Sequence, residues 1–262
     1  MSIAPLALII GVTMVSQAEP PSYIVHRVEQ LPDIASAWDA PEWEAADTVT
    51  IERFHPRGSD HQPHTQVRVL HDGDAIAVMF RVEDRYVIAK HTEYQSPTHL
   101  DSCAELFVKP AGAAGYFNFE FNAIGTLLLW YVEKPRGPDG QFQKYTEVPR
   151  DLGQSIEVHT SLSGPIETEI ADAVTWTISY RIPRSLIESF TGSLGTLTNA
   201  PMRHPIPIGA TGPTWGRSWT SINPRSLGRW SSSNLRTYSA NSSSSDPLER
   251  RSAFFSSFTS LR

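Results

Sequence analysis

The sequence contains one cysteine, Cys103, in 262 residues. An internal disulfide framework is therefore excluded, and the chain must be stabilised by a hydrophobic core, which a chain of this length can form. A positive charge balance is also missing, because 22 Lys and Arg stand against 28 Asp and Glu, for a net charge of -6. Since nucleic-acid binding depends on basic surfaces, the composition argues against a nucleic-acid partner.

The apolar run over residues 3–15 is too short to span a bilayer. Its length suits the hydrophobic region of a signal peptide, and Ser16 and Ala18 place small residues at the usual cleavage spacing. We therefore predict a signal peptide over residues 1–18, a secreted or periplasmic location, and no membrane contact beyond export.

Up to residue 190, no segment has a hydrophobic pattern long enough for an ordinary helix. The sequence instead shows short alternating segments that are separated by turns. The expected strands are 23–28, 48–54, 67–70, 75–82, 103–108, 116–122, 127–133 and 174–182, with a short helical turn over 185–190. This pattern predicts an all-β fold, an antiparallel β-sandwich spanning residues 22–190. We expect Trp38 and Trp43 to fill one end of the sandwich.

The segment 116–122 carries the most informative alternation. Phe117, Phe119 and Phe121 fall on one side of an extended strand, and Asn118, Glu120 and Asn122 fall on the other. An exposed row of amides and a carboxylate can hydrogen-bond a ligand made of hydroxyl groups, which is a sugar. On the preceding strand, Glu105 shares a face with Cys103 and Phe107.

Arg81 leaves the core face of the strand 75–82. If the three strands are neighbours, Arg81, Glu105, Asn118 and Glu120 form one polar surface. The alternative interpretation of this set is a solvated outer face held by cross-strand ion pairs.

Residues 191–262 have a different composition, with 2 acidic residues, 8 Arg, no Lys and 16 Ser. One interpretation is an irregular, low-complexity tail. A second interpretation is a change of reading frame in the coding DNA near residues 190–200. Residues 202–232 can be back-translated with ordinary codons into DNA that, read one nucleotide earlier, encodes an acidic, aromatic segment ending in a strand.

Several segments, taken in order, resemble a known family. They are the Trp38 and Trp43 opening, I-A-V-M-F-R-V-E-D, D-S-C-A-E-L-F-V-K-P, Y-F-N-F-E-F-N-A-I-G-T and W-T-I-S-Y-R-I-P, within about residues 30–190. The chain resembles family 9 carbohydrate-binding modules, in their DOMON-like branch. The resemblance implies a secreted jelly-roll or DOMON-like sandwich that binds carbohydrate or polysaccharide without cleaving it. It also implies association with glycoside hydrolases in carbohydrate catabolism.

The resemblance also implies site residues. Glu105, with Asn118 or Glu120, corresponds to groups that hydrogen-bond the sugar, while two aromatic residues stack on the ring. His99 and Leu100 stand where the first aromatic is expected, with Tyr86 or Tyr94 as substitutes, and the second falls in the aberrant tail. The predicted carbohydrate-binding residues are Arg81, Tyr86, Tyr94, His99, Glu105, Asn118, Glu120 and Asn122.

Two enzymatic or redox alternatives remain open. Glu105 and Glu120 could act as the acid and base of a glycoside hydrolase, although a Ser-His-Asp pattern and a phosphate loop are absent. Met79 with a histidine could ligate haem in a DOMON-type electron-transfer domain. His55, His61 and His64 have only loose metal-ligand spacing. We predict no catalytic residue, no metal site and no cofactor, and leave calcium open.

Overall fold

The alternating segments form sheets in the computed structural model of the chain, which describes residues 23–52, 60–136, 142–194, 202–204 and 208–211. The chain divides into two units, 1–227 and 228–262, and all described residues lie in the first. The predicted signal peptide, His55 and most of the region 191–262 fall outside the described residues.

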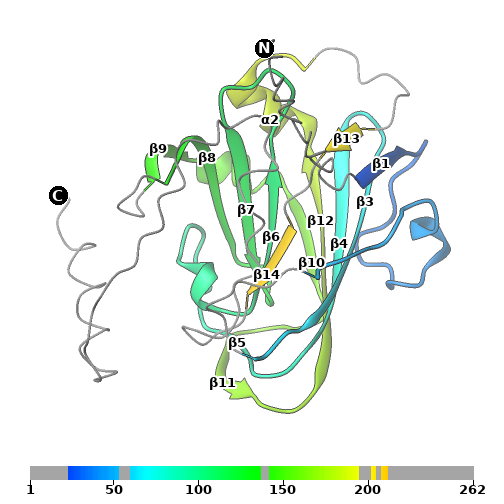
Figure 1. The fold of residues 1–262 in the computed structure, drawn as a ribbon, viewed down its shortest axis with the longest axis vertical. Coiled ribbons are helices and arrows are strands. Elements are labelled where there is room, and N and C mark those ends of the chain that lie inside the picture. Colours follow the sequence, from blue (N-terminus) through cyan, green and yellow to red (C-terminus); the bar gives the residue numbers. More distant parts are fainter. Residues whose placement is uncertain (1–22, 53–59, 137–141, 195–201, 205–207, 212–262) are drawn as a thin grey trace, which may run out of the picture. The chain divides into compact units, whose positions relative to one another are not determined.

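A seven-stranded sheet forms one layer (Figure 1). Its order is β10 (Glu157–Thr160), β12 (Val174–Pro183), β4 (Ala75–Asp84), β3 (His64–His71), β1 (Tyr23–Arg27) and β13 (Met202–His204), with β2 (Val49–Thr50) also pairing with β3. The expected strands 67–70 and 75–82 form the antiparallel pair β3 and β4, with Val67 opposite Phe80. β1 departs from the antiparallel pattern, since it runs parallel to β3.

A five-stranded antiparallel sheet forms the second layer. Its order is β14 (Ile208–Thr211), β6 (Cys103–Val108), β7 (Tyr116–Asn122), β8 (Leu127–Arg136) and β9 (Phe142–Glu147). A small third sheet pairs β5 (Val87–Ala89) with β11 (Ile166–Ile170). The helices are η1 (Pro41–Trp43), η2 (Thr98–Leu100), α1 (Arg150–Gly153) and α2 (Arg184–Thr191). In the described part of the chain, no helix is both long enough and apolar enough to cross a bilayer.

The core lies between the two large sheets. Phe117, Phe119 and Phe121 of β7 all point into it, as the alternation predicts. Across the interface, Phe121 stacks on Tyr180 of β12 with ring centroids 4.4 Å apart. Because each sheet buries one apolar face against the other, the predicted β-sandwich is confirmed.

The strands β13 and β14 come from the region in which the sequence loses its alternation. β13 pairs with β1, and β14 pairs with β6, so each adds a strand to one large sheet. Both strands lie beyond residue 190, the predicted limit of the sandwich.

Trp43 does not fill an end of the sandwich as expected. It is fully buried in a second apolar cluster with Leu70 and Met79, against which Trp38 packs. Met79 alternates with the core residues Val78 and Phe80, so this cluster covers the opposite face of β3 and β4. Met79 therefore has a packing role on the outer side of the seven-stranded sheet.

We expect the Phe121→Ala substitution to lower the free energy of unfolding by about 3–5 kcal/mol, because it removes a fully buried ring that bridges the two sheets. Urea unfolding measures this effect. The matched control is Val158→Ala, at an exposed position of β10, which should change the free energy of unfolding by less than about 0.5 kcal/mol. Equal effects of the two substitutions would contradict this account of the core.

Candidate functional site

The register of β6 and β7 brings the polar residues of the two strands together. Glu105 lies directly opposite Glu120, and Asn118 lies directly opposite Phe107 on one side and Trp130 of β8 on the other. Directly opposite residues of an antiparallel pair share a face, with Cβ atoms about 4.5–5.5 Å apart. We call Glu105, Asn118 and Glu120 the polar site; it lies on the face of the sheet that points away from the core.

The expectation that this polar row is exposed is wrong. Glu105 and Glu120 are each 8% exposed, and Asn118 is 2% exposed. The helix η2 packs against β6 and β7, and the Thr98 hydroxyl donates to the Glu120 carbonyl over 3.2 Å. The side chains of the polar site therefore lie on the predicted face, but η2 helps to bury them.

Two acceptor atoms of the polar site are unpaired within the described structure. The Asn118 amide Nδ2 donates to Glu120 Oε1 over 2.6 Å, which leaves Asn118 Oδ1 and Glu120 Oε2 buried without a hydrogen-bond partner. Trp130 Nε1, on the same face, is also buried and unpaired. Buried polar atoms are nearly always hydrogen-bonded, so these three atoms make this face a candidate site for a polar ligand.

The two carboxyl groups are held in an environment that disfavours charge. Burial, and then the neighbouring Glu120, raise the pKa of Glu105 well above its usual value. Burial raises the pKa of Glu120 to about 7, against the opposing hydrogen bond from Asn118 and the charge of Arg136. Because both shifts favour the protonated form, the pair retains protons at a pH where exposed carboxyl groups are ionised.

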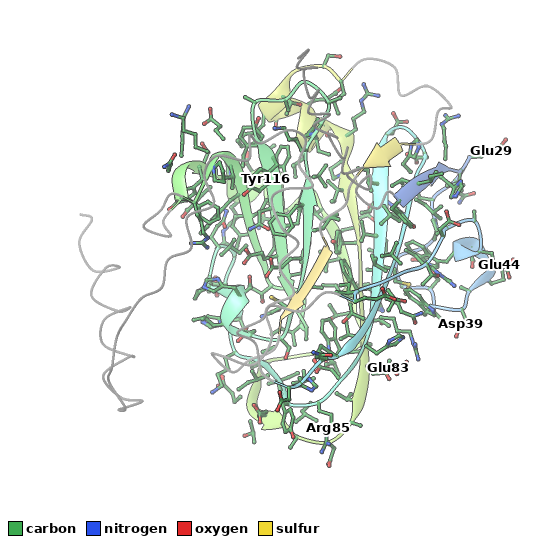
Figure 2. All side chains as sticks on the ribbon, in the orientation of Figure 1. Glu29, Asp39, Glu44, Glu83, Arg85 and Tyr116 are labelled. Atoms are coloured by element: carbon green, nitrogen blue, oxygen red, sulfur yellow. The ribbon has the colours of Figure 1, made fainter. Side chains whose placement is uncertain are left out.

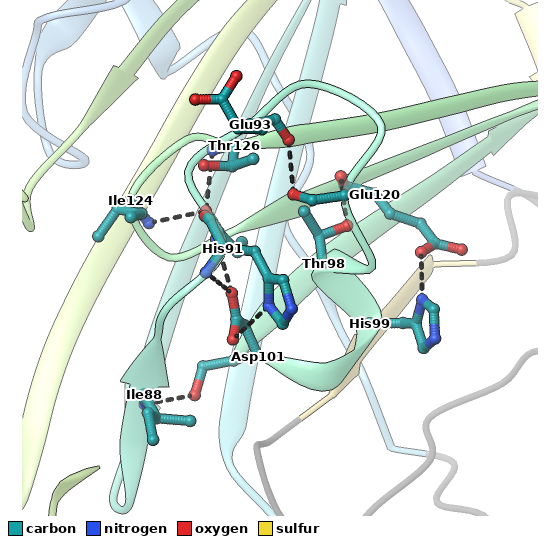
Figure 3. A network of polar contacts seen from close by, with 12 residues as sticks. Ile88, His91, Glu93, Thr98, His99, Asp101, Glu120, Ile124 and Thr126 are labelled. Atoms are coloured by element: carbon teal, nitrogen blue, oxygen red, sulfur yellow. Dashed lines mark hydrogen bonds and ion pairs between the residues drawn. The ribbon is translucent and has the colours of Figure 1, made fainter. Parts of the chain in front are cut away.

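His99 of η2 faces Glu120, as Figure 3 shows. Its Nδ1 lies 3.7 Å from Glu120 Oε2, too far for a hydrogen bond. Burial, followed by the charges of Arg136 and His91, lowers the pKa of His99 below its ordinary value. The imidazole is thus mostly neutral at pH 7 and lines the polar site as a polar ring.

Asn122 is not part of the open hydrogen-bonding set. Its Nδ2 donates to Asp101 Oδ2 over 2.9 Å and to the His91 carbonyl, and its Oδ1 accepts the backbone N–H of Thr126. Asp101 also contacts His91 Nδ1 at 3.0 Å (Figure 3). Asn122 therefore fastens the loop before η2 to the end of β7, which positions His99.

The expectation that Arg81 shares the polar surface is wrong. β4 pairs with β3 and β12 in the seven-stranded sheet, whereas Glu105 and Glu120 lie in the other sheet. Arg81 pairs with Glu83 at 2.7 Å and with Gln66 at 3.1 Å. Figure 2 shows Glu83 on the other side of the fold from Tyr116, the first residue of β7.

The two tyrosines proposed as substitute stacking residues have other contacts. Tyr94 donates its hydroxyl to the Val148 carbonyl over 2.7 Å, and burial raises its pKa to about 12. Tyr86 lies after β4, where its ring contacts His61 edge-on and the Arg85 guanidinium. These contacts give each tyrosine a local packing role.

Sequence reasoning missed two residues beside the polar site. The large ring of Trp130 suggests a core position, but Trp130 alternates with the core residues Leu129 and Tyr131 and therefore faces outward next to Asn118. Arg136, at the end of β8, lies close enough for its charge to oppose the rise in the pKa of both glutamates. Strict alternation along β8 predicts the outward position of Trp130. The position of Arg136 cannot be predicted in the same way, because the pairing of β8 with β9 shifts register after Val132.

Metal binding has no visible basis in the described residues, where no group of three or more His, Cys, Asp or Glu side chains converges. His61 instead contacts Asp84 at 2.6 Å. Glu105, Asn118 and Glu120 offer hydrogen bonds beside the ring of Trp130, and this combination suits a polar, uncharged ligand.

Comparison with known proteins agrees with this chemistry. A family described as carbohydrate-binding family 9 matches residues 39–197. No curated protein matches the chain.

The chain is similar to several solved structures. A candidate carbohydrate-binding protein from Bacteroides uniformis is 21% identical with a TM-score of 0.56, over 66% of this chain and 74% of the other. A family 9 module from Caldicellulosiruptor kristjanssonii, in complex with cellotriose, is 12% identical with a TM-score of 0.46, over 74% and 80%. The glucose complex of a family 9 module from the same organism is 13% identical with a TM-score of 0.38, over 62% and 68%.

The raised pKa values make stability depend on pH. The folded carboxyl groups hold protons that the unfolded chain has already released, so we expect the free energy of unfolding to fall as the pH rises from about 4.5 to about 7. Between pH 5 and pH 8, wild type should lose more stability than the double variant Glu105→Gln and Glu120→Gln, by on the order of 1–3 kcal/mol. Urea unfolding at the two pH values measures the difference, with Glu83→Gln as the exposed control. Parallel pH profiles of wild type and the double variant would contradict the shifts.

Proposed function

The chain belongs to carbohydrate-binding family 9, and we propose that it binds its sugar at the polar site, on the outer face of β6 and β7. The function is non-catalytic carbohydrate binding. Glu105, Asn118 and Glu120 supply the hydrogen-bonding groups, and His99 lies beside them on η2.

One observation carries this assignment: the unpaired acceptors Asn118 Oδ1 and Glu120 Oε2 lie on the same face of the same strand. Leaving a buried acceptor unsatisfied costs about 1–3 kcal/mol. Sugar hydroxyl groups donate hydrogen bonds and are closely spaced on a pyranose ring. A bound sugar can therefore satisfy both atoms and offset that cost.

The protonation of the glutamate pair suits a hydroxyl-rich ligand. A protonated carboxyl group donates one hydrogen bond and accepts others, whereas a carboxylate only accepts. Since the pKa of Glu120 is about 7, the pair offers both kinds of hydrogen bond near neutral pH. Each hydroxyl group can act as donor and acceptor, so the pair can match it in either direction.

We expect Glu105→Ala and Asn118→Ala to abolish or strongly reduce retention on polysaccharide affinity gels. Removing one partner of a buried hydrogen bond costs about 1–3 kcal/mol, which corresponds to a loss of affinity of about 5- to 150-fold. Gels containing soluble cellulose, xylan or mannan derivatives provide the panel, and circular dichroism checks that each variant is folded.

The matched control is Glu83→Ala, which removes an exposed carboxylate from β4 in the other sheet. Its retention should equal that of wild type. Unchanged retention of both Glu105→Ala and Asn118→Ala would place the sugar elsewhere on the chain.

We also propose that the chain is exported and works beside glycoside hydrolases that degrade polysaccharides. The apolar run at residues 3–15 and the small residues before Glu19 support export. N-terminal sequencing of protein recovered from the periplasm or the medium should begin at Glu19. Recovery of a chain that keeps Met1 and stays in the cytoplasm would contradict export.

A further inference from the structure

Three aromatic side chains contact one another on the outer face of the five-stranded sheet. The ring centroid of Trp130 lies 4.6 Å from Tyr145 and 5.4 Å from Phe142, and Phe142 lies 5.8 Å from Tyr145. None of the three belongs to the core between the sheets. Apolar side chains on a surface are normally scattered singly, whereas a contiguous group marks a binding surface. We call these residues the β8–β9 aromatic cluster.

The cluster adjoins the polar site. Trp130 lies directly opposite Asn118, so the two side chains share a face of neighbouring strands. Arg136 links the two groups, because its guanidinium lies 4.1 Å from the ring centroid of Phe142 while its charge acts on Glu105 and Glu120. The polar site and the aromatic cluster therefore adjoin each other on the same face of β6 to β9.

Tyr145 presents the accessible ring of the cluster. It is 43% exposed, and only Val158 joins it as an exposed large hydrophobic side chain in the described part of the chain. Tyr145 lies on β9, two strands from β7, which is a distance of about 10 Å across the sheet. A single sugar ring held by Glu105, Asn118 and Glu120 does not extend that far.

We propose that the β8–β9 aromatic cluster holds a second sugar ring of an oligosaccharide whose first ring occupies the polar site. This inference rests on the proposed function. The exposed face of Tyr145 packs against the apolar C–H face of a pyranose, and the buried, unpaired Nε1 of Trp130 donates a hydrogen bond to a sugar oxygen between the two positions. The chain consequently prefers oligosaccharides of two or more rings to monosaccharides.

A purely structural role for the cluster explains less. Val132 is fully buried and lies opposite Tyr145, so the aromatic rings do cover an apolar residue on this face. Such a cover requires neither an exposed tyrosine ring nor an indole N–H that is withdrawn from water without a partner. A saccharide uses both features at once.

Isothermal titration calorimetry on the full chain tests the proposal with three pairs of sugars: glucose and cellotriose, xylose and xylotriose, and mannose and mannotriose. We expect wild type to bind one trisaccharide at least about tenfold more tightly than its monosaccharide, since one added aromatic contact is worth about one power of ten. Tyr145→Ala should remove that advantage and leave monosaccharide affinity unchanged. Tyr145→Phe, which keeps the ring, should retain it.

Two further variants separate the possible failures. Val158→Ala, the matched exposed control on β10, should bind like wild type, and Asn118→Ala should weaken the monosaccharide and the trisaccharide together. Equal affinity of wild type for both members of every bound pair would overturn the inference while leaving the proposed function intact. So would equal losses for both sugars in Tyr145→Ala. If wild type binds no sugar in the panel, the proposed function fails and the inference fails with it.

Discussion

The antiparallel pairing of β6 with β7 determines which side chains of the two strands face the core and which form the polar site. Side chains alternate along both strands, so one register sends Leu106 and Phe119 into the sandwich and brings Glu105 against Glu120 on the opposite face. A slip of one residue would bury the carboxyl groups in the core and expose the phenylalanines. The hydrophobic core therefore fixes the geometry of the polar site, which stands on rigid strands rather than on loops.

The burial of the polar site makes it suited to binding. A carboxyl pair and an amide on an open surface would be satisfied by water and would gain little from a ligand. Here the η2 segment limits access, while Asn122 and Asp101 hold the preceding loop in place. The unpaired atoms lie next to the β8–β9 aromatic cluster, so directional hydrogen bonds and flat apolar surface meet on one face. Carbohydrate recognition requires this combination.

Local patterns predicted the sandwich and the face on which each β6 and β7 side chain lies. They did not reveal that β4 and β6 belong to different sheets, and for that reason Arg81 was wrongly joined to Glu105. The burial of the polar site was also not predicted. The site is covered by the helix η2, and the alternation of residues along the strands does not show where a helix packs. Trp130 shows the same limit: a large aromatic residue suggests a core position, whereas its strand phase places it outside. The sequence pattern predicts that Asn122 binds a ligand, but its side chain is hydrogen-bonded to Thr126 and Asp101.

The central claim is that Asn118 Oδ1 and Glu120 Oε2 lack partners because a sugar supplies them. A crystal structure of the chain with a bound oligosaccharide tests this claim most directly. The account predicts sugar hydroxyl groups within hydrogen-bond distance of both atoms. A sugar bound elsewhere, with both atoms hydrogen-bonded inside the protein, would contradict it.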